Sequence, residues 1–107
     1  MAGTFSQNRV EGQLAAAKGT LYTTPAATKT LVKTITLVNS DAVARTVNIY
    51  FKNTASRRQI PKDYSLAAGA QLLMSNFVDT LLAGDLIEGD ASAANVVDYW
   101  VSLVEEV

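Results

Sequence analysis

Histidine and cysteine are both absent from the 107 residues of this chain, and their absence limits the chemistry that its side chains can perform. The Ser–His and Cys–His pairs that activate a nucleophile cannot be built from this composition. A thiolate metal site and a disulfide framework are excluded for the same reason. The sequence also has no Ser-x-x-Lys spacing and no glycine-rich phosphate loop. We therefore expect no enzymatic activity, no catalytic residue and no cofactor.

Three acidic residues lie close together in the stretch Asp85-Leu-Ile-Glu88-Gly-Asp90. Their carboxylates could offer oxygen ligands to Ca²⁺ or act as a pair in acid–base catalysis. Alternation along a strand, however, puts Asp85 and Glu88 on opposite faces, and the ligand spacing of a calcium loop is missing. We interpret these acids as the polar ends of a short strand and its turn, and we predict no metal site.

Basic and aromatic side chains cluster between residues 50 and 64. The members are Lys52, Arg57, Arg58 and Lys62, with Tyr50, Phe51 and Tyr64 nearby. Such a cluster can bind nucleic acid or phosphate, but it is more often a charged sheet edge that discourages stray strand pairing. The net charge of −1 argues against nucleic acid as a partner. If this loop binds anything, we expect the acidic surface of a neighbouring subunit, so Arg57 and Arg58 are candidate interface residues.

Trp100 is the only tryptophan, and two interpretations of it stay open. In a small sandwich a tryptophan usually fills the core. The alternative assigns the inner face to a different set of residues: Val97, Tyr99, Val101 and Leu103. Trp100 would then point outward beside Val96 and Val104 and form an exposed apolar strip of the kind that marks interfaces. Trp100 is therefore the third candidate interface residue.

These side chains must be positioned by extended segments. Lys29–Val38 alternates with a period of two, which predicts a strand. One face would carry Leu31, Ile35 and Leu37 and the other Thr30, Thr34 and Thr36, with Lys33 as an exception on the first face. A polar turn at Asn39–Asp41 leads to a second strand over Arg45–Phe51, with Val47, Ile49 and Phe51 on one face.

Glycine and proline mark the boundaries of the later elements. Leu66–Leu72 resembles Leu81–Ile87, and each puts a glycine just before a strand, where a positive φ costs little. Two copies are too few for a repeat architecture. Pro61 ends a strand or lies at an edge, and Gly89–Ser92 is predicted as a turn. We predict a final strand over Asn95–Val104, although its spacing would also suit a helical face.

Turns recur about every ten residues, a pattern typical of an antiparallel sandwich or small barrel. We predict an all-β protein, an antiparallel β-sandwich of jelly-roll-like or immunoglobulin-like type. Residues 13–107 would form the single domain, and residues 1–12 a short N-terminal arm. The first residues do not resemble a secretory signal, and no apolar run approaches the ~20 residues of a membrane span. We expect a protein made in a cytoplasm, without a membrane partner.

Charge is distributed unevenly along the chain. Residues 1–78 hold all nine Lys and Arg and three acids, whereas residues 79–107 hold seven acids and no base. Strands from the two halves could interleave and neutralise one another, the interpretation that we favour. The alternative is a domain with one positive and one negative face, suited to head-to-tail contacts between copies.

The strand and turn patterns resemble a family of small β-sandwich virion structural proteins of tailed bacteriophages. The segments that carry the resemblance are Leu21–Ala26, Val32–Asn39, Ala44–Val47, Leu66–Gly69, Ala83–Gly89 and Ala91–Asn95. Together they span roughly Leu21 to Val104. The resemblance implies a head decoration, fibre-base or tail adaptor protein, located in the virion, whose partners are other capsid or tail proteins. It also implies a homo-oligomer such as a trimer, and it transfers no binding residue.

Two functions follow as expectations. The first is a non-enzymatic phage structural protein that assembles as a homo-oligomer on a head or a tail. The second is a carbohydrate- or receptor-binding sandwich displayed on a virion. Exposed Tyr22, Tyr64 or Trp100 gathered at one end of the sandwich would favour the second function, because sugars stack on aromatic faces.

Overall fold

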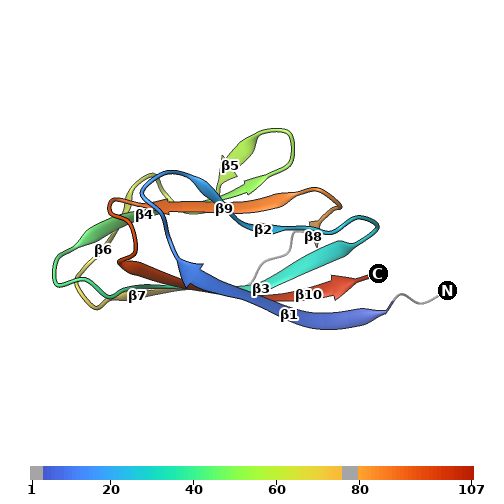
Figure 1. Cartoon of the computed structure of the whole chain (residues 1–107), viewed down its shortest axis with the longest axis horizontal. Helices are drawn as coiled ribbons and strands as arrows, with labels where there is room; N and C mark the ends of the chain where they lie inside the picture. The colour runs from blue at the N-terminus through green and yellow to red at the C-terminus, as the bar shows by residue number, and fades with distance from the viewer. Residues whose placement is uncertain (1–3, 76–79) are drawn as a thin grey trace.

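A computed structural model of the chain describes residues 4–75 and 80–107. Within these residues the chain forms ten β-strands and no helix (Figure 1). The strands are β1 (Phe5–Gln13), β2 (Gly19–Thr23), β3 (Lys29–Asn39), β4 (Arg45–Lys52), β5 (Ser56–Arg58), β6 (Tyr64–Leu66), β7 (Gln71–Met74), β8 (Thr80–Leu81), β9 (Leu86–Ala91) and β10 (Val97–Glu106). No described residue therefore belongs to a helix long and apolar enough to cross a membrane.

The strands form two antiparallel sheets that pack as the two layers of a sandwich (Figure 1). Sheet A has the order β1-β10-β3, and the short strands β7 and β8 share the far edge of β3. Sheet B has the order β2-β9-β4, and β5 and β6 share the far edge of β4. If each pair of short strands is taken as one interrupted strand, this connectivity is a jelly roll. The predicted antiparallel sandwich is confirmed, and of its two variants the connectivity matches the jelly roll.

Apolar side chains from both sheets fill the space between the layers. Fully buried members come from sheet A (Ile35, Leu37, Val97 and Val101) and from sheet B (Val47, Ile49 and Ile87). The predicted inner faces of β4 and β10 are confirmed, because alternate residues of each strand point into this core. The ambiguous C-terminal segment is thus a strand.

A β-bulge in β3 explains the exception that the sequence shows at Lys33. Thr34 pairs with Ser102 and Val32 pairs with Leu103, so Lys33 is the extra residue between two successive pairs. An extra residue in one strand reverses the alternation of the side chains on either side of it. The local period of two therefore breaks at Lys33.

The bulge also corrects the predicted faces of β3. Ile35 and Leu37 face the core as expected, with no exposed surface. Before the bulge the assignment was wrong, because Thr30 is fully buried whereas Leu31 is 43% exposed. Leu31 therefore lies on the outer face of sheet A.

The two glycines predicted to precede strands do so in the left-handed region. Gly69 has φ 73° and Gly84 has φ 88°, which confirms the prediction. Both close turns of the same kind, since Ala70 N–H donates to Ala67 O and Asp85 N–H donates to Leu82 O, each at 2.9 Å. Each turn carries the chain from one sheet to the other, from β6 to β7 and from β8 to β9.

The turn predicted at Gly89–Ser92 was wrong. Strand β9 continues to Ala91, and Gly89 lies in its middle, paired with Ile49 and Gly19. A Cβ on Gly89 would lie 3.1 Å from the Cδ1 atoms of Ile49 and Leu21. Glycine here allows close packing and does not form a turn.

The N-terminal segment expected as an arm, residues 1–12, overlaps β1. From Phe5 onward it pairs along its whole length with β10 and forms one edge of sheet A. Thr4 and Val107 exchange both backbone hydrogen bonds, at 3.2 and 2.9 Å, so the first and last described residues are neighbours. Most side chains of β1 are exposed, which explains its weak hydrophobic pattern.

The acidic and basic halves of the chain interleave in the fold. The acidic strand β10 lies between β1 and β3 in sheet A, and the acidic strand β9 lies between β2 and β4 in sheet B. All four neighbours come from the basic half. This arrangement supports the neutralising interpretation over a domain with two oppositely charged faces.

Candidate interaction surfaces

Trp100 points out of the sandwich from the middle of β10. Val97 and Val101 on the same strand have no exposed surface, whereas Trp100 is 42% exposed. It lies between Glu11 of β1 and Thr36 of β3 in the cross-strand register. The structure therefore places the ring on the outer face of sheet A, where a tryptophan contributes nothing to the core.

Other apolar side chains share that face. Leu73 on β7 pairs with Thr36 on β3 and is 58% exposed. Leu31 is also exposed. Val104 on β10 is half-buried. Val96, expected beside Trp100, packs against the core instead, so that part of the expected strip was wrong. We call the resulting surface the Trp100 face; its members are Arg9, Leu31, Lys33, Leu73, Trp100 and Val104.

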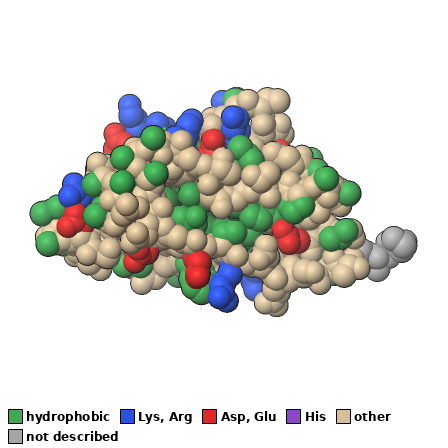
Figure 2. Space-filling view, viewed as in Figure 1, with side chains coloured by type: hydrophobic (Ala, Val, Ile, Leu, Met, Phe, Trp, Pro, Cys, Tyr) green, Lys and Arg blue, Asp and Glu red, His purple; other side chains and the backbone are tan. Residues whose placement is uncertain are grey.

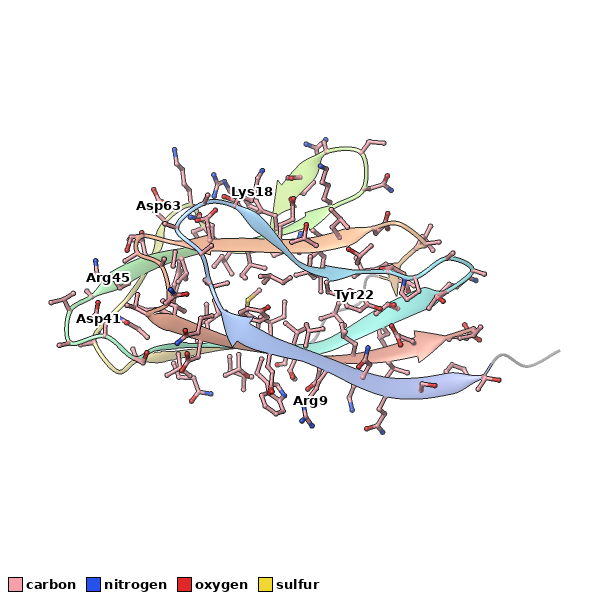
Figure 3. All side chains as sticks on the ribbon, viewed as in Figure 1. Arg9, Lys18, Tyr22, Asp41, Arg45 and Asp63 are labelled. Atoms are coloured by element: carbon pink, nitrogen blue, oxygen red, sulfur yellow. The ribbon has the colours of Figure 1, made fainter. Side chains whose placement is uncertain are left out.

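Two cations flank the tryptophan on this face. The guanidinium carbon of Arg9 lies 4.6 Å from the centroid of the Trp100 ring, within cation–π range. A shallow hollow of about 590 Å³ opens beside them, with Lys33 and Ser102 in its lining. Figure 3 shows Arg9 projecting from the outer side of sheet A. Tryptophan and arginine are the residues most enriched at the energetic centres of protein interfaces.

The outer face of sheet B carries a different, polar cluster centred on Tyr50. Lys18 Nζ lies 4.7 Å and Arg58 Cζ 5.0 Å from the centroid of the Tyr50 ring. The Tyr50 hydroxyl donates to Asp90 Oδ2 at 3.1 Å. Burial, followed by the charge of Asp90, raises the pKa of Tyr50. The phenol therefore stays protonated as a donor.

Asn48 ties this cluster to the neighbouring strands and the loop before β6. Its Nδ2 donates to Asp63 Oδ1 at 3.0 Å and to Asp90 Oδ1 at 2.8 Å. Its Oδ1 accepts from Arg58 Nη1 at 2.6 Å and from the backbone N–H of Asp63 at 2.9 Å. Asn48 is only 6% exposed, so these bonds replace the water that it loses. The cluster is a satisfied network that stabilises the sheet.

The three clustered acids take separate roles. Asp85 Oδ2 accepts the Leu82 N–H at 2.9 Å in the turn before β9. Glu88 Oε1 accepts the Ser56 hydroxyl at 2.6 Å, and Asp90 belongs to the Tyr50 cluster. Among residues 4–75 and 80–107, no three acidic side chains come together in a way that could hold a metal ion. Each acid thus has a separate hydrogen-bonding role, but Glu88 and Asp90 lie within β9 rather than at its end or in a turn, so that part of the interpretation was wrong.

The candidate interface residues do not form one site. Arg57 and Arg58 belong to β5 in sheet B, and Trp100 belongs to β10 in sheet A. Arg58 is held in the Tyr50 cluster, whereas Arg57 lines a groove of about 420 Å³ together with Thr80 and other residues. Arg9 and Lys33, which do flank Trp100, were missed because their proximity depends on strand pairing between distant segments.

The aromatic side chains that would mark a sugar site are dispersed. Tyr22 is only 6% exposed. Tyr64 is 37% exposed on β6 of sheet B, and Trp100 lies on the opposite sheet. The three rings thus do not gather at one end of the sandwich.

Tyr22 joins the two sheets through its hydroxyl. It donates to Glu105 Oε2 on β10 at 2.5 Å and lies 2.8 Å from Thr30 Oγ1 on β3. Burial, followed by the hydrogen bond to Glu105, raises the pKa of Tyr22 to about 12. Figure 3 shows Tyr22 on β2, in the layer opposite β10.

Comparison with solved structures supports the fold over nearly the full chain. A chain in the acid-stable capsid structure of the Helicobacter pylori bacteriophage KHP30 has a TM-score of 0.62 and 12% identity; the match covers 100% of this chain and 90% of that one. A chain from the disulfide-linked pili known as Bacillus endospore appendages has a TM-score of 0.55 and 15% identity; the match covers 98% and 89%. At these identities the likeness is one of fold. No protein-family model matches the sequence. No curated protein matches it either.

Proposed function

We propose that this chain is a non-enzymatic structural protein of a bacteriophage virion that assembles as a homo-oligomer on the head or the tail. Its partners would be further copies of itself and other capsid or tail proteins. Shape and surface complementarity would be its mechanism, with exposed apolar side chains supplying affinity and charged ones setting orientation.

The Trp100 face is the observation that carries this proposal. Three large apolar side chains, Leu31, Leu73 and Trp100, are each more than 40% exposed on one sheet face. The Arg9 guanidinium lies over the Trp100 ring, and Lys33 lines the hollow beside it. An apolar centre with a charged surround has the anatomy of a protein–protein interface. The jelly-roll connectivity adds support, because this fold recurs in capsid proteins that tile a shell.

The alternative, a carbohydrate- or receptor-binding module on a virion, has less support. The jelly roll also occurs in lectins, so the fold itself does not discriminate. Of the three rings, Tyr22 is buried, and Tyr64 and Trp100 lie on opposite sheets. A sugar site built on stacking normally uses more contacts in a concave pocket.

Sedimentation and tryptophan fluorescence of the purified chain test the proposal together. We expect a discrete oligomer at micromolar concentration, with Trp100 emission that shifts to longer wavelength on dilution as the ring becomes hydrated. A monomer whose tryptophan emission does not change with protein concentration but does change with added glycans would contradict the proposal. It would support the alternative, a carbohydrate- or receptor-binding module.

A further inference from the structure

Strand β1 presents a nine-residue edge whose second side pairs with no other described residue. Thr4 and Val107 exchange both backbone hydrogen bonds, and Leu14 N–H donates to Val97 O. Because such bonded pairs alternate along an antiparallel ladder, the even-numbered residues from 4 to 14 direct their N–H and C=O groups at β10. The odd-numbered residues, 5 to 13, direct theirs away from the sheet.

The side chains along this edge have a self-complementary order. Arg9 and Glu11 are two residues apart, so both point to the outer face of sheet A. Val10, between them, points to the inner face and is only partly buried against the core. Gln7 and Gln13 flank the two charges symmetrically.

We propose that β1 pairs antiparallel with β1 of a second copy of this chain, with the two-fold axis at Val10. In this register Arg9 of each copy lies opposite Glu11 of the other, and Gln7 lies opposite Gln13. The hydrogen-bonding groups of the odd-numbered residues meet one another, as an antiparallel ladder requires. The two A sheets become one continuous sheet.

Neighbouring registers bring like charges together. An axis at Arg9 puts two arginines opposite each other, and an axis at Glu11 puts two glutamates opposite each other. Like charges directly across a strand pair are destabilising, whereas opposite charges are favourable. Of these three registers, only the axis at Val10 pairs both charges of each copy with an opposite charge.

The flank beside β1 offers apolar surface to the same partner. The edge strands β1 and β2 lie on one side of the sandwich, one from each layer (Figure 1). Figure 2 shows a band of hydrophobic side chains between the two layers on this side. Val10 and Leu21, from β1 and β2, are partly buried hydrophobic residues packed against the core. A second copy that docks along β1 would cover part of this band, and burial of apolar area would add to the strand pairing.

In the single chain, the Asn8 side chain occupies one of the backbone hydrogen-bonding groups of this edge. Asn8 Oδ1 accepts the N–H of Arg9 at 2.8 Å, and that N–H is one of the groups the second copy would use. Asn8 must rotate away when the copies pair. We therefore expect Asn8→Ala to strengthen the association.

Cysteine cross-linking tests the register directly, because the natural chain contains no cysteine. Across the axis, the two Cα atoms of residue 10 form a non-hydrogen-bonded pair about 4.5 Å apart, within disulfide range. Val10→Cys should give a covalent dimer under mild oxidation. Asn8→Cys is the matched control, since the two copies of residue 8 would lie about 14 Å apart along the strands, at ~3.4 Å per residue. Equal cross-linking of both variants, or none with Val10→Cys, would overturn the register.

A charge swap gives an independent readout by sedimentation equilibrium. Arg9→Glu alone and Glu11→Arg alone should each weaken the dimer about tenfold or more, because each places like charges opposite one another twice. The double variant Arg9→Glu/Glu11→Arg restores opposite charges and should recover most of the affinity. A double variant as weak as the single ones would contradict the pairing.

This inference rests on the proposed homo-oligomeric role and can fail separately from it. A two-fold contact of this kind closes at two copies, so a trimer would need a different surface. If the unmodified chain forms an oligomer that neither the charge variants nor Val10→Cys affects, the β1 pairing is wrong and the assembly role stands. If the chain stays monomeric at all concentrations, both are overturned.

Discussion

The guanidinium of Arg9 lies over the ring of Trp100, with 4.6 Å between the guanidinium carbon and the ring centroid. The two residues come from β1 and β10 and are separated by most of the chain. Their contact brings an exposed aromatic ring and a cation together on the Trp100 face, and it leads to the first prediction.

Trp100→Ala should reduce assembly much more than folding. The ring is 42% exposed, so its removal should change the free energy of unfolding by no more than about 1 kcal/mol. A tryptophan at the centre of an interface can be worth ~2 kcal/mol or more in association. Urea denaturation measures the first quantity and sedimentation the second.

Tyr64→Ala is the matched control, because Tyr64 is a similarly exposed aromatic residue, 37%, on the opposite sheet. It should leave the oligomer unchanged. Equal losses of assembly in the two variants would show that the Trp100 face has no special role.

Tyr22→Phe should destabilise the sandwich by about 1–3 kcal/mol, because it removes the hydroxyl that bridges Thr30 and Glu105 and leaves their oxygens without this partner. The folded state raises the pKa of Tyr22 from 10.0 to about 12, so it favours the protonated phenol. The resulting stabilisation is fully present below pH 10 and is lost as the pH rises from 10 toward 12.

The difference in unfolding free energy between the natural chain and Tyr22→Phe should therefore shrink across this alkaline range. Urea denaturation of both proteins at a series of pH values measures it, and other titrating groups cancel in the comparison. A difference that stays constant from pH 8 to pH 12 would disprove the linkage.

Asn39 and Thr24 occupy equivalent places at the two inter-sheet turns, and they should respond oppositely to loss of their polar atoms. Asn39 accepts the Gly69 N–H on its backbone oxygen, as Thr24 accepts the Gly84 N–H. The Asn39 side chain is fully buried and donates to the backbone oxygens of Val43, Leu66 and Ala67. Asn39→Ala should cost about 2–4 kcal/mol, because these buried oxygens lose their donor.

Thr24 provides the contrast. Its buried Oγ1 has no hydrogen-bond partner among the described residues. Thr24→Val keeps the shape and removes an unsatisfied hydroxyl, so thermal denaturation should show equal or higher stability, by up to ~1 kcal/mol. A large loss for Thr24→Val would mean that the hydroxyl is satisfied after all.

Gly69→Ala and Gly84→Ala should each lower stability by roughly 1 kcal/mol, because both residues have positive φ values that a Cβ disfavours. Space is not the obstacle, since nothing lies within 4 Å of a Cβ built on either glycine. Gly19→Ala is the control: it lacks a positive φ, and its Cβ would meet only the Ala17 backbone oxygen, at an ordinary contact distance of 3.9 Å. Chemical denaturation should separate the three variants, and three equal changes would refute the conformational explanation.

Local patterns predicted those parts of the fold that local physics decides. In β4 and β10 the alternating apolar residues are those that face the core, and the two glycines follow from turn geometry. The charged residue Lys33 on an otherwise apolar face was also informative. It marks the extra residue of a bulge, where the alternation of side chains breaks.

The errors arose where distant segments decide the outcome. Gly89 resembles a turn residue in sequence, but it lies in mid-strand, where Ile49 and Leu21 pack closely against β9. Most residues of β1 are exposed, so its sequence shows no alternation of apolar and polar residues from which a strand could be predicted. The grouping of Arg9 with Trp100, and the separation of Arg57 from both, depend on which strand enters which sheet, and the spacing of residues in the sequence does not encode that choice.

Because Thr4 and Val107 form a hydrogen-bonded pair, the first and last described residues lie together at one end of the molecule. A peptide joined before Thr4 and one joined after Val107 would emerge side by side. The longest dimension of the molecule is 51 Å, so the opposite tip lies at most that far from both of them. A short linker could close the chain into a circle, and new ends could be opened at the opposite pole. On a particle, every copy would present such additions in one orientation and leave the other pole unobstructed.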